Sequence, residues 1–305
     1  MSKKIIQAQN NIDPSLVGLK KNRSLVRPYE RKWVQGLIIF FVTFCAIFSL
    51  FPLLLTVINS LKTDDQVAAN VFSLPTGEMF KALASNFAAA WNEINVYFGR
   101  TMIIALIGAI FEVLISSALA YILTFKEFYF KNLIFMFYIS ILLVPSIIGY
   151  PVLTPLVKDT LGLRNAQVIG FLLPMIGGCQ AAGMFLFKTF FSQQPKSLYE
   201  CAKIEGNNDL KCYLKITLPL ALPIVLYYFV GCFSGIYNEY LWASLIFDPS
   251  KTTLMTRMLS LVDSGTLVYG SMYAMYLISS VPLIITTIIS MKYFKSGEFA
   301  AGLKL

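Results

Sequence analysis

The stretch Trp33–Ile58, WVQGLIIFFVTFCAIFSLFPLLLTVI, decides the fold class of this chain. It contains no charged side chain, and it is longer than the roughly 20 residues that an apolar helix needs to cross a bilayer. In the hydrocarbon layer every backbone polar group must be paired inside the protein, and a single segment achieves this only as a helix. The stretch therefore predicts a transmembrane α-helix.

Five further apolar stretches of similar length follow this one. They are Thr101–Phe125, Leu133–Val157, Val168–Phe191, Leu218–Phe247 and Leu267–Phe294. The third and fourth of the six spans contain several prolines and glycines, which membrane helices tolerate where neighbouring groups satisfy the freed backbone. We therefore predict an all-α polytopic membrane protein with six transmembrane helices, the third and fourth being bent or interrupted.

Composition supports a membrane protein and excludes a soluble one. Apolar residues make up 57% of the 305 residues and charged residues only 13%, about half the fraction in a soluble domain. The net charge of +9 does not indicate nucleic-acid binding, because the basic residues lie in short segments between apolar runs and form no basic face.

The distribution of basic residues predicts the orientation in the membrane. With the N-terminus inside, the inner segments hold 18 of the 25 lysines and arginines and the outer segments hold 7. Cytoplasmic loops are the ones enriched in Lys and Arg. We therefore predict a cytoplasmic, partly disordered N-terminal tail over 1–32, a six-span domain over 33–294 and a cytoplasmic C-terminal tail over 295–305.

The sequence offers no candidate catalytic residue, metal site or cofactor. The chain has no histidine, and its five cysteines show no C-x-x-C spacing, so we interpret them as reduced packing residues. It also lacks the G-x-x-x-x-G-K-[ST] motif that binds ATP phosphates. We expect a protein that is not an enzyme.

The cytoplasmic loop 192–218, between the fourth and fifth spans, predicts two short helices. Ser197 is the expected cap of the first helix, with Glu200 as its capping-box partner, and Gly206 is its expected C-terminal stop. Asn207 or Asn208 is expected to cap the second. Helices this short cannot bury their apolar sides alone, so the loop should lie on the membrane or against another protein.

The same loop resembles a known sequence pattern. Glu200-Cys201-Ala202, Gly206 and Ile216-x-Leu218-Pro219 are similar to the E-A-A---G---------I-x-L-P pattern of permease subunits in bacterial ABC importers. The chain departs from it with Cys201 for alanine, Glu205 for aspartate and Asn207 for a small residue. The resemblance implies coupling helices that sit in a groove of an ATP-hydrolysing subunit. The implied coupling residues are Glu200, Cys201, Ala202, Glu205, Gly206, Leu218 and Pro219.

Three other segments resemble the carbohydrate branch of this family. They are Ala120-Tyr121 before a basic turn, Tyr237-Asn238-Glu239-Tyr240-Leu241-Trp242, which is similar to W-N-E-F-L-W, and the C-terminal stretch Gly297–Lys304. The last departs from the pattern by having Ala301-Gly302 in reversed order. The resemblance is to the second permease of maltose-type importers.

The resemblance implies the partners and the mode of action. It implies a multi-pass protein of the bacterial cell membrane that forms a heterodimer with a second permease. Two ATP-binding subunits would bind at the cytoplasmic face, and an extracytoplasmic sugar-binding protein would deliver a sugar or oligosaccharide. ATP hydrolysis would then drive alternating access of the cavity.

Candidate pathway residues lie in the fifth span. Tyr237, Asn238, Tyr240 and Trp242 combine flat apolar faces with hydrogen-bonding groups, which suits a sugar ring. On a continuous helix Asn238 and Trp242 share a face, so we expect Asn238 to line the cavity and Glu239 to point toward a helix partner. A pathway role for Glu239 remains an alternative, since carboxylates in spans often face a pathway.

Two other features of the spans have two interpretations each. Glu112 in the second span is either structural or part of the pathway, and we favour a structural role because it lacks the amide and the several aromatic neighbours that surround Glu239. The G-x-x-x-G of Gly231 and Gly235 indicates close helix packing, within this chain or at a subunit interface.

Two competing functions are weighed against the importer permease. An ion-gradient-driven secondary transporter would show paired acids or broken helices in two repeated halves, and the sequence has no such repeat. A non-transport membrane scaffold would leave the loop 192–218, which we call the docking loop, without a role.

Overall fold

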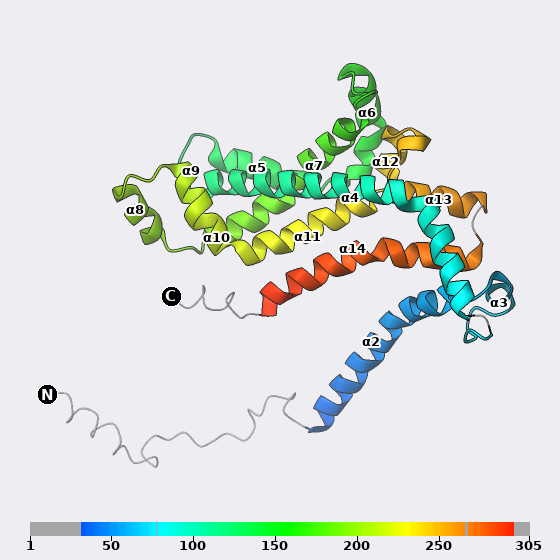
Figure 1. Cartoon of the computed structure of the whole chain (residues 1–305). Coiled ribbons are helices and arrows are strands. Elements are labelled where there is room, and N and C mark those ends of the chain that lie inside the picture. Colours follow the sequence, from blue (N-terminus) through cyan, green and yellow to red (C-terminus); the bar gives the residue numbers. More distant parts are fainter. Residues whose placement is uncertain (1–31, 78, 266–267, 296–305) are drawn as a thin grey trace, which may run out of the picture. The chain divides into compact units, whose positions relative to one another are not determined.

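The computed structural model describes residues 32–77, 79–265 and 268–295, and every regular element in these ranges is helical (Figure 1). Most of the predicted N-terminal tail and the Gly297–Lys304 stretch lie outside the described residues. The elements are α2 (Lys32–Ser60), α3 (Asp64–Ala69), α4 (Met79–Phe125), α5 (Lys131–Ile141), η3 (Ser146–Gly149), α6 (Tyr150–Pro155), η4 (Leu156–Thr160), α7 (Gln167–Phe191), α8 (Lys196–Ile204), α9 (Asp209–Cys212), η5 (Tyr213–Thr217), α10 (Leu218–Leu220), α11 (Leu222–Asn238), α12 (Leu241–Ile246), η6 (Pro249–Lys251), α13 (Leu254–Ser264) and α14 (Tyr269–Lys295).

Three of these helices, α2, α4 and α14, are each long and apolar enough to cross a membrane. Three bent pairs bring the number to six if each pair is one span. The pairs are Lys131–Ile141 with Ser146–Thr160 (91°), Gln167–Gly178 with Gln180–Phe191 (43°), and Asp209–Leu220 with Leu222–Asn238 (84°). The all-α prediction is confirmed, and the third and fourth spans are bent as predicted.

The sequence predicts the fifth span as one helix over Leu218–Phe247, and the structure differs from this prediction. The span is broken at Ala221, between Pro219 and Pro223, which lack the N–H group that a continuous helix needs. It ends at Asn238, and Glu239 has extended backbone. The second span also differs, because α4 begins at Met79 and runs without a break for 47 residues.

The chain divides into two compact units between Leu55 and Thr56. In the first unit, residues 32–55 of α2 carry large exposed apolar side chains such as Trp33, Phe40 and Phe48. A helix that is apolar on all sides is typical of a span surrounded by lipid or other helices.

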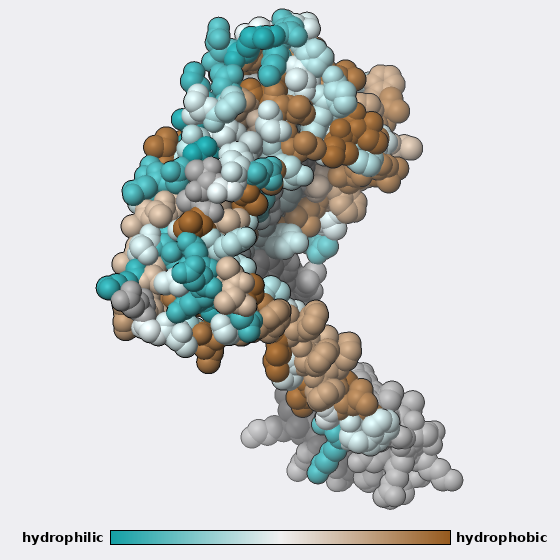
Figure 2. All heavy atoms as spheres, turned by 90° about the vertical axis from the view of Figure 1, so that its right-hand side faces the viewer, coloured by the Kyte–Doolittle hydropathy of each residue, from teal (hydrophilic) through white to brown (hydrophobic). Residues whose placement is uncertain are grey.

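Helix α4 is the centre of the second unit, where it packs against α7, α11 and α14. In Figure 1, α8, α9 and α10 lie at one end of α4, α3 lies at the other end, and α12 and α13 lie near the bend of α4. Figure 2 looks onto the end with α12 and α13, where hydrophilic residues gather. Polar elements thus lie at both ends of the apolar helices, as expected where a membrane protein meets water.

Small residues allow the helices to approach α4 closely. A Cβ atom added at Gly108 would lie 2.6 Å from Cδ1 of Ile236 in α11 and 2.8 Å from Cδ2 of Leu172 in α7. Helix contacts in membranes rely on such van der Waals packing, because lipid is as apolar as the side chains. Gly108 therefore brings three spans together.

A buried lysine joins the end of α2 to the segment after α3 and is bound by a side chain of α4. The Lys62 side chain is fully buried, and its Nζ donates to Oδ1 of Asn59 (2.9 Å), the Asn70 carbonyl (3.0 Å) and the Val71 carbonyl (3.1 Å). Burial lowers the pKa of the Lys62 ammonium, and the three oxygens offset part of that cost. Nδ2 of Asn86 in α4 donates to the Lys62 carbonyl (2.9 Å).

Replacing this lysine should destabilise the protein strongly. Lys62→Met keeps the side-chain volume but leaves the buried Asn59 oxygen and the Asn70 and Val71 carbonyls without this donor, so we expect a loss of roughly 3 kcal/mol of stability. Thermal unfolding of the detergent-solubilised protein measures the effect. Lys251→Met, at an exposed lysine of η6, is the matched control and should leave the unfolding temperature unchanged. Equal unfolding temperatures for the two variants would contradict the structural role of Lys62.

Candidate functional site

Helix α8, the first helix of the predicted docking loop, ends as the sequence predicts. Gly206 has φ +78°, its N–H donates to the Lys203 carbonyl (3.0 Å), and the Asn207 N–H donates to the Ala202 carbonyl (3.0 Å). This pair of bonds is the Schellman motif, in which a residue with positive φ closes a helix. Gly206 is thus confirmed as the helix stop.

The caps of the two loop helices agree only in part with the prediction. Oδ1 of Asn208 accepts from the Lys211 N–H (2.9 Å), which confirms Asn208 as the cap of the second helix. The prediction that Ser197 caps the first helix is wrong, because α8 starts two residues after Gln194, at Lys196, and the capping position is Pro195. The extended backbone of Pro195 sets this start, and Ser197 lies inside the first turn.

The outer side of the loop is exposed and carries large apolar side chains. The exposed fraction of Ile204 is 86%, which is unusual for an isoleucine. Most of the predicted coupling residues are exposed on the same loop, whereas Ala202 is buried and Leu218 half-buried. The exposed members are Glu200, Cys201, Glu205, Gly206 and Pro219, and the exposed apolar neighbours are Leu198, Ile204, Leu210 and Leu214.

The inner side of the loop packs against the ends of α4 and α7. Tyr199, Ala202, Cys212 and Tyr213 belong to one buried cluster with side chains of both helices. Burial raises the pKa of the Tyr199 phenol, and its hydrogen bond to Thr217 opposes the shift. The loop thus has one face fixed to the membrane domain and one face without cover from the described residues.

A cavity of about 640 Å³ lies between α4, α7, α11 and the corner from α5 to α6. Its lining is mostly apolar, with Glu112 and Glu239 as its ionisable carboxylates and Tyr150, Tyr228 and Trp242 as its aromatic side chains. The rings of Tyr150 and Trp242 lie 5.1 Å apart at 36°. A second cavity, of about 870 Å³, shares the lining residues Leu142, Ala182, Tyr228 and Gly231.

Glu112 reaches the cavity from the middle of α4. Its side chain is 1% exposed, and Oη of Tyr228 donates to its Oε1 (3.0 Å). The structural role that we favoured is supported by this bond between α4 and α11, but the residue also lines the cavity. A role of Glu112 in the pathway stays a prediction.

Glu239 occupies the break between α11 and α12. Its Oε1 accepts from the Trp242 N–H (2.8 Å), one of the free N–H groups in the first turn of α12. Nε1 of Trp242 donates to the Phe171 carbonyl in α7 (3.0 Å). The prediction of which side chains share a face assumed a continuous helix, and that assumption is wrong because the helix breaks at Glu239. Glu239 and Trp242 both line the cavity.

The other three pathway candidates lie elsewhere. Tyr237 is fully buried, and its Oη donates to the Ser279 carbonyl in α14 (2.9 Å). Asn238 is exposed, and its Nδ2 donates to the Ser234 carbonyl of its own helix (2.9 Å). Tyr240 is also exposed, at the helix break. None of the three is among the residues that line the cavity of Glu112 and Glu239.

The G-x-x-x-G of α11 does not pack against another helix within the described residues. A Cβ atom added at Gly231 or Gly235 would meet nothing within 4 Å. Both glycines line the cavity instead, so the prediction of close packing inside this chain is wrong. The absence of side chains here widens the cavity.

Sequence reasoning missed Tyr150 and Tyr228 as cavity residues. Each is one tyrosine among 16 in an apolar stretch, so no spacing or composition separates it from its neighbours. The signal that was available is Glu112, an isolated carboxylate in a span, because such a group needs a hydroxyl or cation nearby.

Comparisons with known proteins agree with this arrangement. Residues 112–297 match the family described as binding-protein-dependent transport system inner membrane component. The chain is 27% identical over 241 residues to the diacetylchitobiose uptake system permease protein of Streptomyces coelicolor, covering 77% of each chain. It is 27% identical over 267 residues to the trehalose/maltose transport system permease protein of Thermococcus litoralis (85% of this chain and 93% of the relative). It is 25% identical over 278 residues to the arabinooligosaccharides transport system permease protein of Bacillus subtilis (88% and 95%).

The family match covers more than half of the chain, including the docking loop, the cavity helices and both cavity carboxylates. The relatives are matched over most of their own length. The chain therefore belongs to the inner membrane components of binding-protein-dependent transport systems and is the permease subunit of such an ABC transporter.

Proposed function

We propose that this permease forms half of the translocation pathway of a sugar importer and couples to separate ATPase subunits. Support for sugar comes from the relatives, which are permeases for diacetylchitobiose, for trehalose and maltose, and for arabinooligosaccharides. The cavity with Glu112, Glu239 and Trp242 adds hydrogen-bonding groups beside an aromatic face, a combination that suits a sugar.

One observation supports the coupling role more than any other. The docking loop exposes Ile204 and Leu210 beside Gly206, on helices that are otherwise fixed firmly to the membrane domain. Exposed apolar side chains gathered on one rigid element mark a protein-binding surface. We assign this surface to an ATP-hydrolysing subunit, one of two in the complex.

The remaining partners follow from the same proposal. A second permease completes the pathway as a heterodimer, and an extracytoplasmic binding protein delivers sugar to the outer mouth. ATP binding and hydrolysis by the partner subunits then alternate the access of the cavity. An ion-gradient-driven transporter or a scaffold is disfavoured, because the matched family belongs to binding-protein-dependent systems.

The proposed orientation, with both termini in the cytoplasm, places the loop at Ser73 outside and the docking loop inside. In a cysteine-free background, Ser73→Cys should react with a membrane-impermeant thiol reagent on intact cells, whereas Ser197→Cys should react only after permeabilisation. Ser197 is exposed in the structure, so shielding inside the protein would not mimic a cytoplasmic location. Labelling of Ser197→Cys on intact cells would overturn the orientation.

Substitutions at Gly206 test the coupling role of the docking loop. Nothing lies within 4 Å of an added Cβ atom there, so its positive φ is the constraint, and a β-branched residue resists that conformation. Gly206→Val should insert normally but lose at least tenfold in uptake, because it distorts the docking surface. Gly206→Asn is the control, because asparagine adopts positive φ more readily. The measurements are copurification of the ATPase subunits and sugar uptake in vesicles, and normal uptake by Gly206→Val would refute the coupling role.

Substitutions at Glu239 and Asn238 test the proposed roles of these two residues in the translocation pathway. Glu239→Ala removes the acceptor for the Trp242 N–H and should lower stability by about 1 kcal/mol, whereas Glu239→Gln retains an acceptor oxygen and should remain stable. If the carboxylate contacts sugar, Glu239→Gln should still reduce uptake. Asn238→Ala should assemble normally, and its uptake reports directly on our prediction that Asn238 contributes to the pathway. Unfolding temperature, complex yield and uptake of labelled maltose, trehalose and diacetylchitobiose separate these effects.

A further inference from the structure

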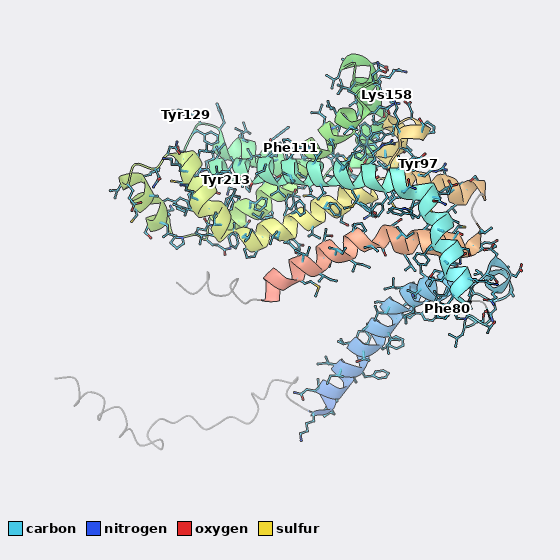
Figure 3. The ribbon with its side chains drawn as sticks, viewed as in Figure 1. Phe80, Tyr97, Phe111, Tyr129, Lys158 and Tyr213 are labelled. Carbon is cyan, nitrogen blue, oxygen red and sulfur yellow. The ribbon has the colours of Figure 1, made fainter. Side chains whose placement is uncertain are left out.

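Two buried hydroxyl groups join the docking loop to α4. Oη of Tyr213 in η5 lies 2.7 Å from Oγ of Ser117 in α4, and the tyrosine ring lies 5.4 Å from the ring of Tyr121 (Tyr213 is labelled in Figure 3). Oγ of Ser117 also lies 2.6 Å from the Val113 carbonyl. Oη of Tyr213 also lies 3.4 Å from the Leu114 carbonyl, so either hydroxyl can donate in the bond between Tyr213 and Ser117.

The two short helices of the loop are also joined to each other. Oη of Tyr199 in α8 lies 2.9 Å from Oγ1 of Thr217 in η5, and both side chains are buried. The ring of Tyr199 lies 4.1 Å from the ring of Phe125 at the end of α4. The loop therefore contacts α4 as one body, through buried groups.

An ion pair between α4 and the loop is a weaker connection. Nζ of Lys126 lies 2.5 Å from Oδ2 of Asp209, but both side chains are more than one third exposed. Exposed ion pairs of this kind contribute little in water. The buried hydroxyl pair is the stronger candidate for transmitting force.

The route through α4 leads directly to the cavity. Ser117 and Glu112 lie on the same unbroken helix, about 7.5 Å apart along its axis at 1.5 Å per residue. Glu112 lines the cavity and accepts from Tyr228 in α11. Another route, along the backbone into α11, passes through the 84° bend at Ala221.

We propose that the contact between Tyr213 and Ser117 is the joint through which the docking loop moves α4 and thereby the cavity wall. The two are positioning residues, since neither is among the lining residues of the two cavities described above. The inference rests on the proposed coupling role of the loop. It goes further by naming the contact and the helix that carry the movement.

The test uses the whole purified transporter in proteoliposomes. A reporter variant, Ser146→Cys, places one thiol in the cavity lining, with the five native cysteines replaced. The rate at which a maleimide labels this thiol is measured with and without ATP and vanadate, so the test requires no knowledge of the sugar. ATP hydrolysis and complex yield are measured in parallel. Into this background Tyr213→Phe, Ser117→Ala and the double variant are introduced.

We expect ATP to change the labelling rate several-fold in the reporter transporter. In each single variant most of that change should be lost, while ATP hydrolysis stays within about twofold of the reporter. The double variant should be no worse than either single variant, because all three break the same joint. Tyr129→Phe, at an exposed tyrosine of the turn after α4, is the matched control and should behave as the reporter does (Figure 3).

Three results would overturn the inference. The first is an unchanged response to ATP in both single variants, and the second is an additive effect in the double variant. The third is a parallel loss of yield, ATP hydrolysis and labelling response, which indicates that the contact only holds the fold together. Absence of any ATP-dependent change in the reporter transporter itself would instead overturn the proposed function.

Discussion

The close approach of α7 and α11 to α4 is the contact on which the second unit depends. Within lipid there is no hydrophobic driving force between helices, so α4 holds its neighbours through short packing distances. At Gly108 there is no room for even a methyl group between α4, Ile236 and Leu172. Both cavities lie beside these packed helices, whose side chains form part of the cavity walls.

The polar side chains of the spans obey a second constraint, since no water is present in hydrocarbon to satisfy them. Hydroxyls bond back to their own helix, as Ser117 does to the Val113 carbonyl and Thr124 to the Ala120 carbonyl. Tyr228 donates across to Glu112, so that the carboxylate is held between two helices. Hydrogen bonds between polar side chains thus connect α4 to α11 and to the docking loop.

The docking loop combines two surfaces that a soluble loop would not show together. Its inner aromatic side chains, Tyr199 and Tyr213, are buried against α4, while Ile204 and Leu210 are exposed on its outer side. In the proposed coupling role, the buried side would make the loop move with the membrane domain, and the exposed side would offer the ATPase subunit an apolar surface. This is the arrangement that coupling to a separate subunit requires.

Sequence alone determined the helical class, the approximate spans, the position of the loop in the chain and the role of Gly206 as a helix stop, and it left the cap of the second loop helix open between Asn207 and Asn208. These follow from local chemistry, because span length, proline content, positive φ and helix caps act over a few neighbouring residues. Only the tertiary structure decided which residues meet. Glu239 lines the cavity because the backbone breaks beside it, and Glu112 does so because Tyr228 lies opposite. The Glu112–Tyr228 contact joins residues 116 positions apart, and no helical period in the sequence encodes it.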